Sequence, residues 1–458
     1  MQSSIRWVYY LRISERATDF LRTYILARLL EPSDYGIFAL AYSVVSFLDS
    51  STNLGLEAQI IKEEQADRKY INTVWTISLL RSAAVVILIL FLSSFCADFF
   101  KVSQITIVVL SSTVILRALS NPGVAILVKE FNFKKYFLFR YPVSLSNVFS
   151  SIFFGFIFRD FNALVFATIV GSIFYFVMSY LVHDFRPSFC FEHSKSIIRF
   201  GGWLAGINTL SISLSHIDVY IIGKILGAEN VGIYSMARNL ASLAIFEFAS
   251  IIGEFAFPLF AKVRREAIQS KFSEIVQFNS IVSSAILVTL IFYSNEIIIL
   301  LLSKKWYNVP HILSIVLISF YFISNISFGS QLFITQNKPN IFFFGHLVRL
   351  LTLATLLPIF ANFGLKNATI AILIASTMEF VIFYIFSEKM IKNTVTLKNV
   401  TMYFKFPLIS FVCYLSAFIL LPNFQFSFIL KIFVGILLYI IVVRKDFKNL
   451  LKNVGKQD

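Results

Sequence analysis

Apolar runs of about 20 residues recur along almost the whole chain, and this feature restricts the possible folds more than any other. A helix of roughly 20 apolar residues crosses a bilayer core about 30 Å thick. The chain is 57% hydrophobic and 14% charged, whereas soluble domains average roughly 45–50% and about 25%. We therefore expect an all-α integral membrane protein with fourteen spans. The predicted spans are residues 6–30, 35–61, 73–96, 104–127, 138–158, 163–182, 200–226, 231–260, 273–294, 310–335, 341–361, 368–387, 401–421 and 427–443.

A stretch near the start of the chain returns in the second half. Residues 20–47 align without a gap with residues 216–243, at an offset of 196 residues. Apolar residues often match by chance in a chain this hydrophobic, so the residues that flank the apolar runs matter more. In both copies a basic residue ends one apolar run, a short polar turn follows, and a Gly-Ile-aromatic sequence begins the next run. The alternative to a repeat is coincidence. The matched pairs are Tyr24 and Tyr220, Ile25 and Ile221, Arg28 and Lys224, Leu30 and Leu226, Gly36 and Gly232, Ile37 and Ile233, and Ala41 and Ala237.

The repeat predicts how the chain divides into domains. Six spans per half is an even number, so the halves would be parallel and related by an axis along the membrane normal. We expect a six-helix lobe at residues 1–183, a cytoplasmic linker at 184–199 and a second six-helix lobe at 200–388. Residues 389–458 then add two transmembrane helices and a basic tail.

The loops predict the orientation of the chain. On one side of the fourteen spans the loops and tails carry 24 Lys and Arg residues, and on the other side they carry 5. Because cytoplasmic loops are enriched in Lys and Arg, both termini are expected in the cytoplasm. The net charge of +15 then comes mostly from the Lys and Arg residues of the cytoplasmic loops. No polar stretch is long enough to form a nucleic-acid-binding face.

Several function classes lack their sequence signals. The chain contains no phosphate-binding loop and no metalloprotease or serine hydrolase motif. The isolated Cys96, Cys190 and Cys413 suggest neither disulfides nor a metal site, and we expect no cofactor. All outer loops are short, which disfavours a polymerase or ligase of lipid-linked sugars.

The first predicted span carries an unusual stripe of charge. Arg12, Glu15, Arg16 and Asp19 fall on one helical face, with Arg22 at its edge. Each charge in mid-membrane costs roughly 2.5–3.5 kcal/mol on the insertion scale, so the stripe is expected to face a wet cavity or another helix. The alternative is an amphipathic helix lying on the membrane surface, and span one need not cross completely.

Other ionisable residues also lie within predicted spans. Such a residue suggests function, although for any one of them a structural ion pair is an equal alternative. In span eight, Arg238 and Glu247 point to opposite faces, and spacing does not decide which face lines a cavity. Arginine predominates among these residues, and its planar guanidinium group can bind two oxygens of a phosphate or carboxylate at once. Arg81 is expected to reach the membrane surface, and the histidines are expected in loops or at interfaces. The remaining candidates are Arg117, Arg349, Asp49, Asp218 and Glu379.

Two motifs resemble a known family. Asp218-x-x-x-Ile-Gly-Lys-x-Leu-Gly-x-x-x-x-Gly-Ile-Tyr-x-x-Ala, ending at Ala237, and the first-half copy from Leu26 to Phe38 resemble Wzx-type O-antigen and polysaccharide flippases. These belong to the multidrug/oligosaccharidyl-lipid/polysaccharide exporter superfamily. The resemblance implies two six-helix lobes around a cavity that carries an undecaprenyl-diphosphate-linked oligosaccharide to the outer leaflet by alternating access. The implied location is the bacterial inner membrane.

The resemblance and the charges together predict a transporter rather than an enzyme. Arg12, Arg16, Arg22, Arg117, Arg238 and Arg349 are the expected substrate-binding residues of the cavity. Asp49, Asp218 and Glu379 are the expected ion-coupling or structural carboxylates, with a proton or Na⁺ as the coupling ion. The expected partners are the lipid-linked oligosaccharide, membrane lipids and polysaccharide polymerase machinery, and the chain is expected to act as a monomer. The alternative function is a multidrug exporter of the same superfamily.

Overall fold

All regular structure in the described part of the chain is helical, as the apolar runs predicted. The computed structural model describes residues 2–64, 66–262, 268–335, 338–392, 397–421 and 428–454. Ten of the described helices are long and apolar enough to cross a membrane. The all-α class is thus confirmed, while the count of fourteen spans and the six-plus-six repeat stay predictions.

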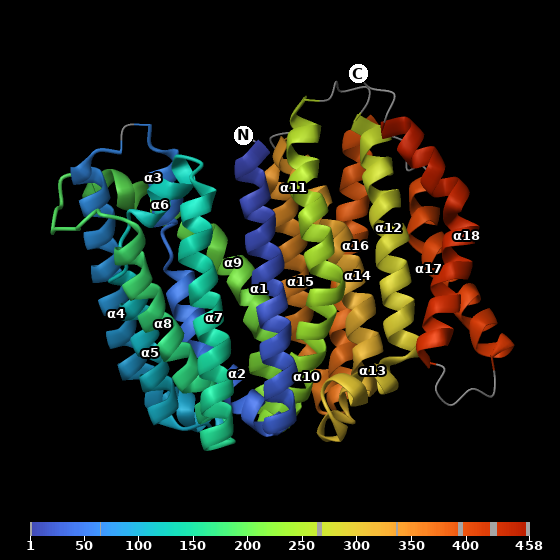
Figure 1. Cartoon of the computed structure of the whole chain (residues 1–458), viewed down its shortest axis with the longest axis horizontal. Coiled ribbons are helices and arrows are strands. Elements are labelled where there is room, and N and C mark those ends of the chain that lie inside the picture. The colour runs from blue at the N-terminus through green and yellow to red at the C-terminus, as the bar shows by residue number, and fades with distance from the viewer. Residues whose placement is uncertain are drawn as a thin grey trace. The chain divides into compact units, whose positions relative to one another are not determined.

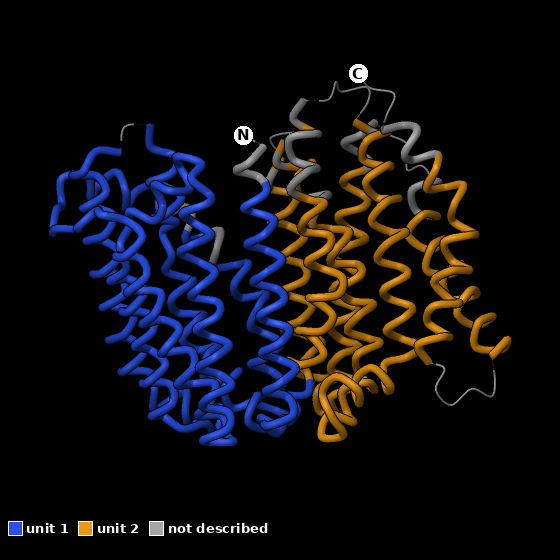
Figure 2. The backbone as a smooth tube through the Cα atoms, in the orientation of Figure 1, with its two compact units in different colours: residues 1–233 blue, residues 234–458 orange. Residues whose placement is uncertain are grey.

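The chain forms two compact units, residues 1–233 and residues 234–458 (Figure 2). This boundary lies inside one helix, and the predicted division into two lobes, a linker and two added helices stays a prediction. Unit 1 contains α1 (Gln2–Leu29), α2 (Pro32–Ser51), α3 (Leu56–Lys62), α4 (Arg68–Phe100), α5 (Gln104–Ala118), α6 (Val124–Lys129), α7 (Phe133–Phe158), α8 (Asn162–Val182), α9 (Ser194–Leu226) and the start of α10 (Ala228–Ala241).

The helices of unit 1 pack side by side (Figure 1). α1 packs along α7, α7 along α8, α8 against α5 and α5 against α4. α2 contacts α4, α5 and α9. Buried Leu26 of α1 and Leu30, which directly follows α1, pack with Ala163 and Leu164 of α8. α1 is therefore part of a helix bundle, unlike an amphipathic helix that lies alone on a membrane surface.

Two of the predicted spans are broken helices, and the same turn makes both breaks. Residues 35–61 form α2 and α3, and residues 104–127 form α5 and α6. In the first break the Asn53 side chain accepts the backbone N–H of Gly55 at 2.8 Å, and Gly55 has φ 62°. In the second, Asn121 accepts the N–H of Gly123 at 2.9 Å. Asn competes with the helix for backbone partners in this way, so expecting continuous helices here was wrong.

Unit 2 is also a helix bundle. It contains the rest of α10, a π-helical turn (Ser242–Phe246) and α11 (Glu247–Lys262). α12 (Ile268–Phe292), α13 (Ser294–Leu301), a 3₁₀ turn (Lys304–Trp306), α14 (Val309–Thr335), α15 (Pro339–Ala361), α16 (Leu365–Lys392), α17 (Leu397–Leu420) and α18 (Phe428–Val454) follow. α14 packs against α11 and α16, and α16 packs along α15. A buried aromatic cluster that includes Phe333, Phe380 and Phe383 holds these helices together.

The first turns of α2 and α10 meet at two glycines that the sequence repeat had matched. A Cβ on Gly36 would collide with the carbonyl oxygen of Ala228. A Cβ on Gly232 would collide with the carbonyl oxygen of Pro32. The two contacts correspond residue for residue at the repeat offset of 196. Only glycine permits this close backbone approach.

Replacing either glycine with alanine tests this crossing. Gly36→Ala and Gly232→Ala are each expected to destabilise the protein by about 1–3 kcal/mol, the usual cost of overpacking, although alanine is intrinsically the better helix former. Thermal melting of the purified protein in detergent measures the change. Gly206→Ala in α9, where no described atom lies within 4 Å of the added Cβ, is the control. Unchanged melting of all three variants would contradict the close approach.

Candidate functional site

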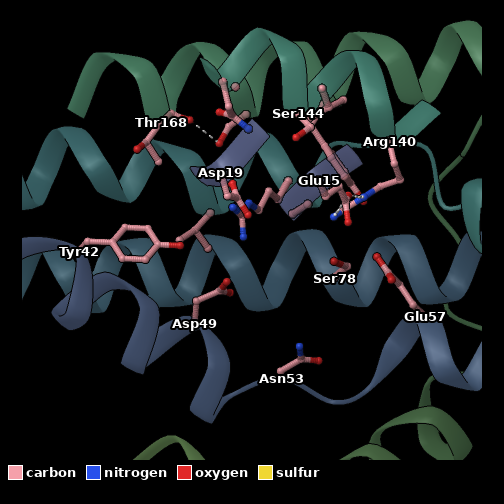
Figure 3. Close-up of a pocket in the computed structure, with 18 of the residues that line it drawn as sticks. Glu15, Asp19, Tyr42, Asp49, Asn53, Glu57, Ser78, Arg140, Ser144 and Thr168 are labelled. Atoms are coloured by element: carbon pink, nitrogen blue, oxygen red, sulfur yellow. Dashed lines mark hydrogen bonds and ion pairs between the residues drawn. The ribbon is translucent and has the colours of Figure 1, made fainter. Parts of the chain in front are cut away.

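A large cavity lies inside unit 1. It has a volume of about 950 Å³ and is lined by residues of α1, α2, α3, α4, α5, α7 and α8 (Figure 3). The break between α2 and α3 opens onto it, because Asn53, Gly55 and Glu57 all line its wall. The break between α2 and α3 therefore forms part of the polar wall of the cavity.

The charged stripe of α1 faces this cavity. Glu15, Arg16, Asp19 and Arg22 all line it, whereas Arg12 is not among the lining residues. Arg16 and Asp19 are 3.7 Å apart, and each side chain is about half exposed. Thr18, on the adjoining face of α1, shares a 2.6 Å hydrogen bond with Ser144 of α7. The stripe thus has the wet surroundings that its charges require.

Two ion pairs bridge helices across the cavity wall. Arg140 of α7 donates to Glu15 of α1, with its Nε at 3.0 Å and an Nη at 2.9 Å; Figure 3 shows the two side chains meeting. Arg81 of α4 donates through Nη2 to the carboxylate of Asp49 at 2.9 Å. Its Nη1 donates to the Asp49 carbonyl at 2.8 Å and to the Thr52 hydroxyl at 2.9 Å. Charge-assisted bonds of this kind are stronger than neutral ones.

Two cavity arginines have no such partner. Arg22 and Arg117 make neither a hydrogen bond nor an ion pair with any residue in the described part of the chain. The full charged lining comprises five arginines and four carboxylates, one net positive charge: Arg16, Arg22, Arg81, Arg117 and Arg140, with Glu15, Asp19, Asp49 and Glu57. Two guanidinium groups are thus available to an anion.

One expectation about the cavity charges was wrong: Arg81 was expected to reach the membrane surface, but it binds Asp49. Arg140 lies within the predicted span 138–158, yet it was not singled out as a site residue. Its partner Glu15 lies on another helix, so spacing along α7 gave no sign of the pair.

The other predicted site residues do not line this cavity. Asp218 lies buried on α9, where its carboxylate accepts the Val219 N–H at 2.8 Å. Arg238 is half-buried on α10. Arg349 and Glu379 pair with each other at 3.3 Å in unit 2. His346, expected in a loop or at an interface, instead lies within α15 and contacts Glu379.

Comparison with known proteins places the chain in a family. A family model described as "Polysaccharide biosynthesis protein" matches residues 25–310, which is more than half of the chain. The chain belongs to the polysaccharide biosynthesis protein family. The recognition of a Wzx-type member of the exporter superfamily is therefore confirmed, and with its ten apolar helices the chain is a multi-pass membrane protein.

Two curated members of this polysaccharide biosynthesis group are similar to the chain. The lipopolysaccharide biosynthesis protein WzxC of Escherichia coli (strain K12) is 20% identical over 303 residues, covering 64% of this chain and 61% of WzxC. A putative O-antigen transporter of Shigella flexneri is 27% identical over 334 residues, covering 65% of this chain and 76% of that protein. The chain thus matches about three fifths of WzxC and about three quarters of the Shigella protein.

A solved structure shares the fold of this family member. The lipid II flippase MurJ, in an inward closed conformation, superposes with a TM-score of 0.74 at 17% identity. The match covers 98% of this chain and all of MurJ. At 17% sequence identity, this similarity shows a shared fold and nothing about function.

The Glu15–Arg140 bridge is testable by a double-mutant cycle. We expect Glu15→Gln and Arg140→Gln each to destabilise the protein, because each leaves a partly buried charge without its partner. The double variant should lose less than the sum, with a coupling of about 0.5–3 kcal/mol. Thermal unfolding in detergent gives the four values. Strict additivity would mean that the bridge does not hold α1 to α7.

Proposed function

We propose that this protein is a transporter that moves an undecaprenyl-diphosphate-linked oligosaccharide from the cytoplasmic to the outer leaflet of the bacterial inner membrane. Transport would proceed by ion-coupled alternating access and would make no covalent change in the substrate. The names of its relatives support this class: a lipopolysaccharide biosynthesis protein, an O-antigen transporter and, by fold, a lipid II flippase.

The observation that carries the proposal is the presence of unpaired arginines in the unit 1 cavity. A guanidinium in a helix bundle ordinarily has a partner, because an uncompensated charge away from water is costly. Arg22 and Arg117 line a cavity of about 950 Å³, and neither forms a hydrogen bond or ion pair with a described residue; Asp19 and Glu57 interact with them only at longer range. A diphosphate provides oxygens that such planar forks bind in pairs, and a cavity of this size accommodates a headgroup.

The paired arginines have a second role in this scheme. Arg81 and Arg140 bind the carboxylates of Asp49 and Glu15. A phosphate oxygen arriving at either pair would compete with the carboxylate for the same donors. A bound anion would therefore rearrange the contacts of α1 with α7 and of α2 with α4.

The remaining predicted residues keep their proposed roles. Arg16 joins Arg22 and Arg117 in binding the anionic headgroup or acidic sugar. Arg12, Arg238 and Arg349 are proposed to meet the substrate outside the unit 1 cavity or during transit. Asp49, Asp218 and Glu379 are proposed as the carboxylates that couple an ion or stabilise the fold. A multidrug exporter would favour an acidic, aromatic cavity for organic cations, and five lining arginines argue against it.

The proposed topology is fourteen spans with both termini in the cytoplasm and a monomeric chain. It comprises two six-helix lobes and two added C-terminal helices. The excess of Lys and Arg on one side of the predicted spans supports this orientation.

Arginine substitutions test the proposed function. Arg22→Gln and Arg117→Gln are each expected to reduce surface polysaccharide about tenfold or more, since a hydrogen bond to a charged group contributes about 1.5–3 kcal/mol. The assay is complementation of a strain that lacks its own transporter, with protein level measured. Arg28→Gln is the matched control, because Arg28 lies on the same helix, stacks over Tyr24 and is not among the lining residues. Full activity of both cavity variants would refute the assignment.

Reporter fusions test the topology. A green fluorescent protein fused after residue 458 is expected to fluoresce, and an alkaline phosphatase fused there is expected to be inactive, because both report a cytoplasmic C-terminus. Fusions at residues 303–308, between the predicted spans 273–294 and 310–335 and on the predicted outer side, should give the opposite result. An active phosphatase at the C-terminus would require an odd number of spans or an inverted chain.

A further inference from the structure

Unit 2 holds a cluster of three ionisable side chains in its interior. His346 and Arg349 lie one turn apart on α15, and Glu379 faces them from α16. The Glu379 side chain is 1% exposed. The side chains of His346 and Arg349 are 17% and 15% exposed.

Both oxygens of the Glu379 carboxylate are occupied. Oε1 lies 2.5 Å from Nδ1 of His346, and Oε2 accepts a hydrogen bond from Nη1 of Arg349 at 3.3 Å. An ionised carboxylate only accepts hydrogen bonds, so beside an ionised Glu379 a neutral His346 would hold its hydrogen on Nδ1. This leaves the lone pair of Nε2, which makes no hydrogen bond to any described residue.

Few other ionisable groups surround this cluster. α14, which packs against both helices, contributes Tyr321, whose hydroxyl donates to the Tyr403 carbonyl, and His311 in its first turn. From α17, Tyr403 reaches α16 and Lys405 pairs with Asp446. On α16, Lys366 lies in the first turn, far along the helix from Glu379. Among the described residues of these helices, no other charged side chain forms a hydrogen bond or ion pair with the cluster.

We propose that the His346–Glu379–Arg349 cluster is a proton-binding site, and that the proton it takes up is the ion coupled to transport. The proposal has two parts: the cluster binds a proton (the binding clause), and this proton is the ion coupled to transport (the coupling clause). Only the coupling clause rests on the proposed function. Nε2 of neutral His346 accepts a proton from water on one side of the membrane and returns it to water after the conformational change. No other bond forms or breaks.

The contacts favour a proton over sodium. Hard metal cations take several oxygen ligands, whereas both Glu379 oxygens already face nitrogen donors. Imidazole changes charge near neutral pH, and it needs no ligand set to do so.

Protonation of His346 changes the net charge of the cluster. With neutral His346 the formal charges of Arg349 and Glu379 cancel, and the added proton leaves one net positive charge in the interior of the bundle. Such a charge is far better solvated by water than by protein. Proton uptake therefore favours the conformation in which the cluster is hydrated, and this difference can drive a two-state transporter.

Proton uptake by the purified full-length protein in nanodiscs tests the binding clause. A pH-indicator dye counts the protons bound between about pH 8 and about pH 5, the range in which histidine changes charge. The wild-type chain is expected to bind one more proton than His346→Gln. Thr352→Val is the matched control, because Thr352 lies one turn beyond Arg349 and contacts Met378 of α16; it should match the wild type. His346→Asn replaces the Gln variant if the latter does not fold.

Two results would overturn the binding clause. Equal proton uptake by the wild type and His346→Gln would mean that His346 does not change its charge between about pH 8 and about pH 5. The cluster would then be a structural ion pair only. Release of about one proton on adding NaCl, but not choline chloride, would mean that the site takes sodium.

Surface polysaccharide at matched protein level tests the coupling clause. His346→Gln and Glu379→Gln are expected to lower it about tenfold or more, and Thr352→Val to leave it unchanged. Normal polysaccharide in both cluster variants would overturn the coupling clause. If the wild-type chain itself restores no polysaccharide while the difference in proton uptake persists, the proposed function fails and the proton site stands.

Discussion

Charge inside a membrane helix bundle must have a partner or water, and this constraint accounts for the arrangement of the protein. Three of the ion pairs described above link different helices in the two bundles: α1 to α7, α2 to α4 and α15 to α16. Because breaking a pair leaves an uncompensated charge, these contacts fix how neighbouring helices pack. The same requirement makes the unpaired arginines of the unit 1 cavity the most informative residues in the chain.

The two compact units use their charges differently. In unit 1 the charges surround a large cavity, and the helix breaks at Asn53 and Asn121 interrupt apolar helices near it. In unit 2 the cluster of His346, Arg349 and Glu379 is small and closed, with its carboxylate almost wholly buried. The proposed substrate site and the proposed proton site therefore lie in different units of the chain.

The glycine crossing adds a geometric constraint. Gly36 and Gly232 bring the first turns of α2 and α10 into backbone contact, and the second compact unit begins one residue after Ile233. Because no side chain separates the two backbones, substitution of either glycine would disturb the packing of α2 against α10.

The sequence by itself determined the class of the protein: apolar runs dictate membrane helices because no other local structure satisfies their backbone in lipid. Periodicity also placed Glu15, Arg16, Asp19 and Arg22 on one face of α1 and excluded lipid as their neighbour. The partners of these charges were decided only by the tertiary structure. Glu15 meets Arg140, Asp49 meets Arg81, and His346 meets Glu379 across helices that are distant in sequence. Helical spacing reports neighbours within one helix, whereas packing determines which faces of two helices meet.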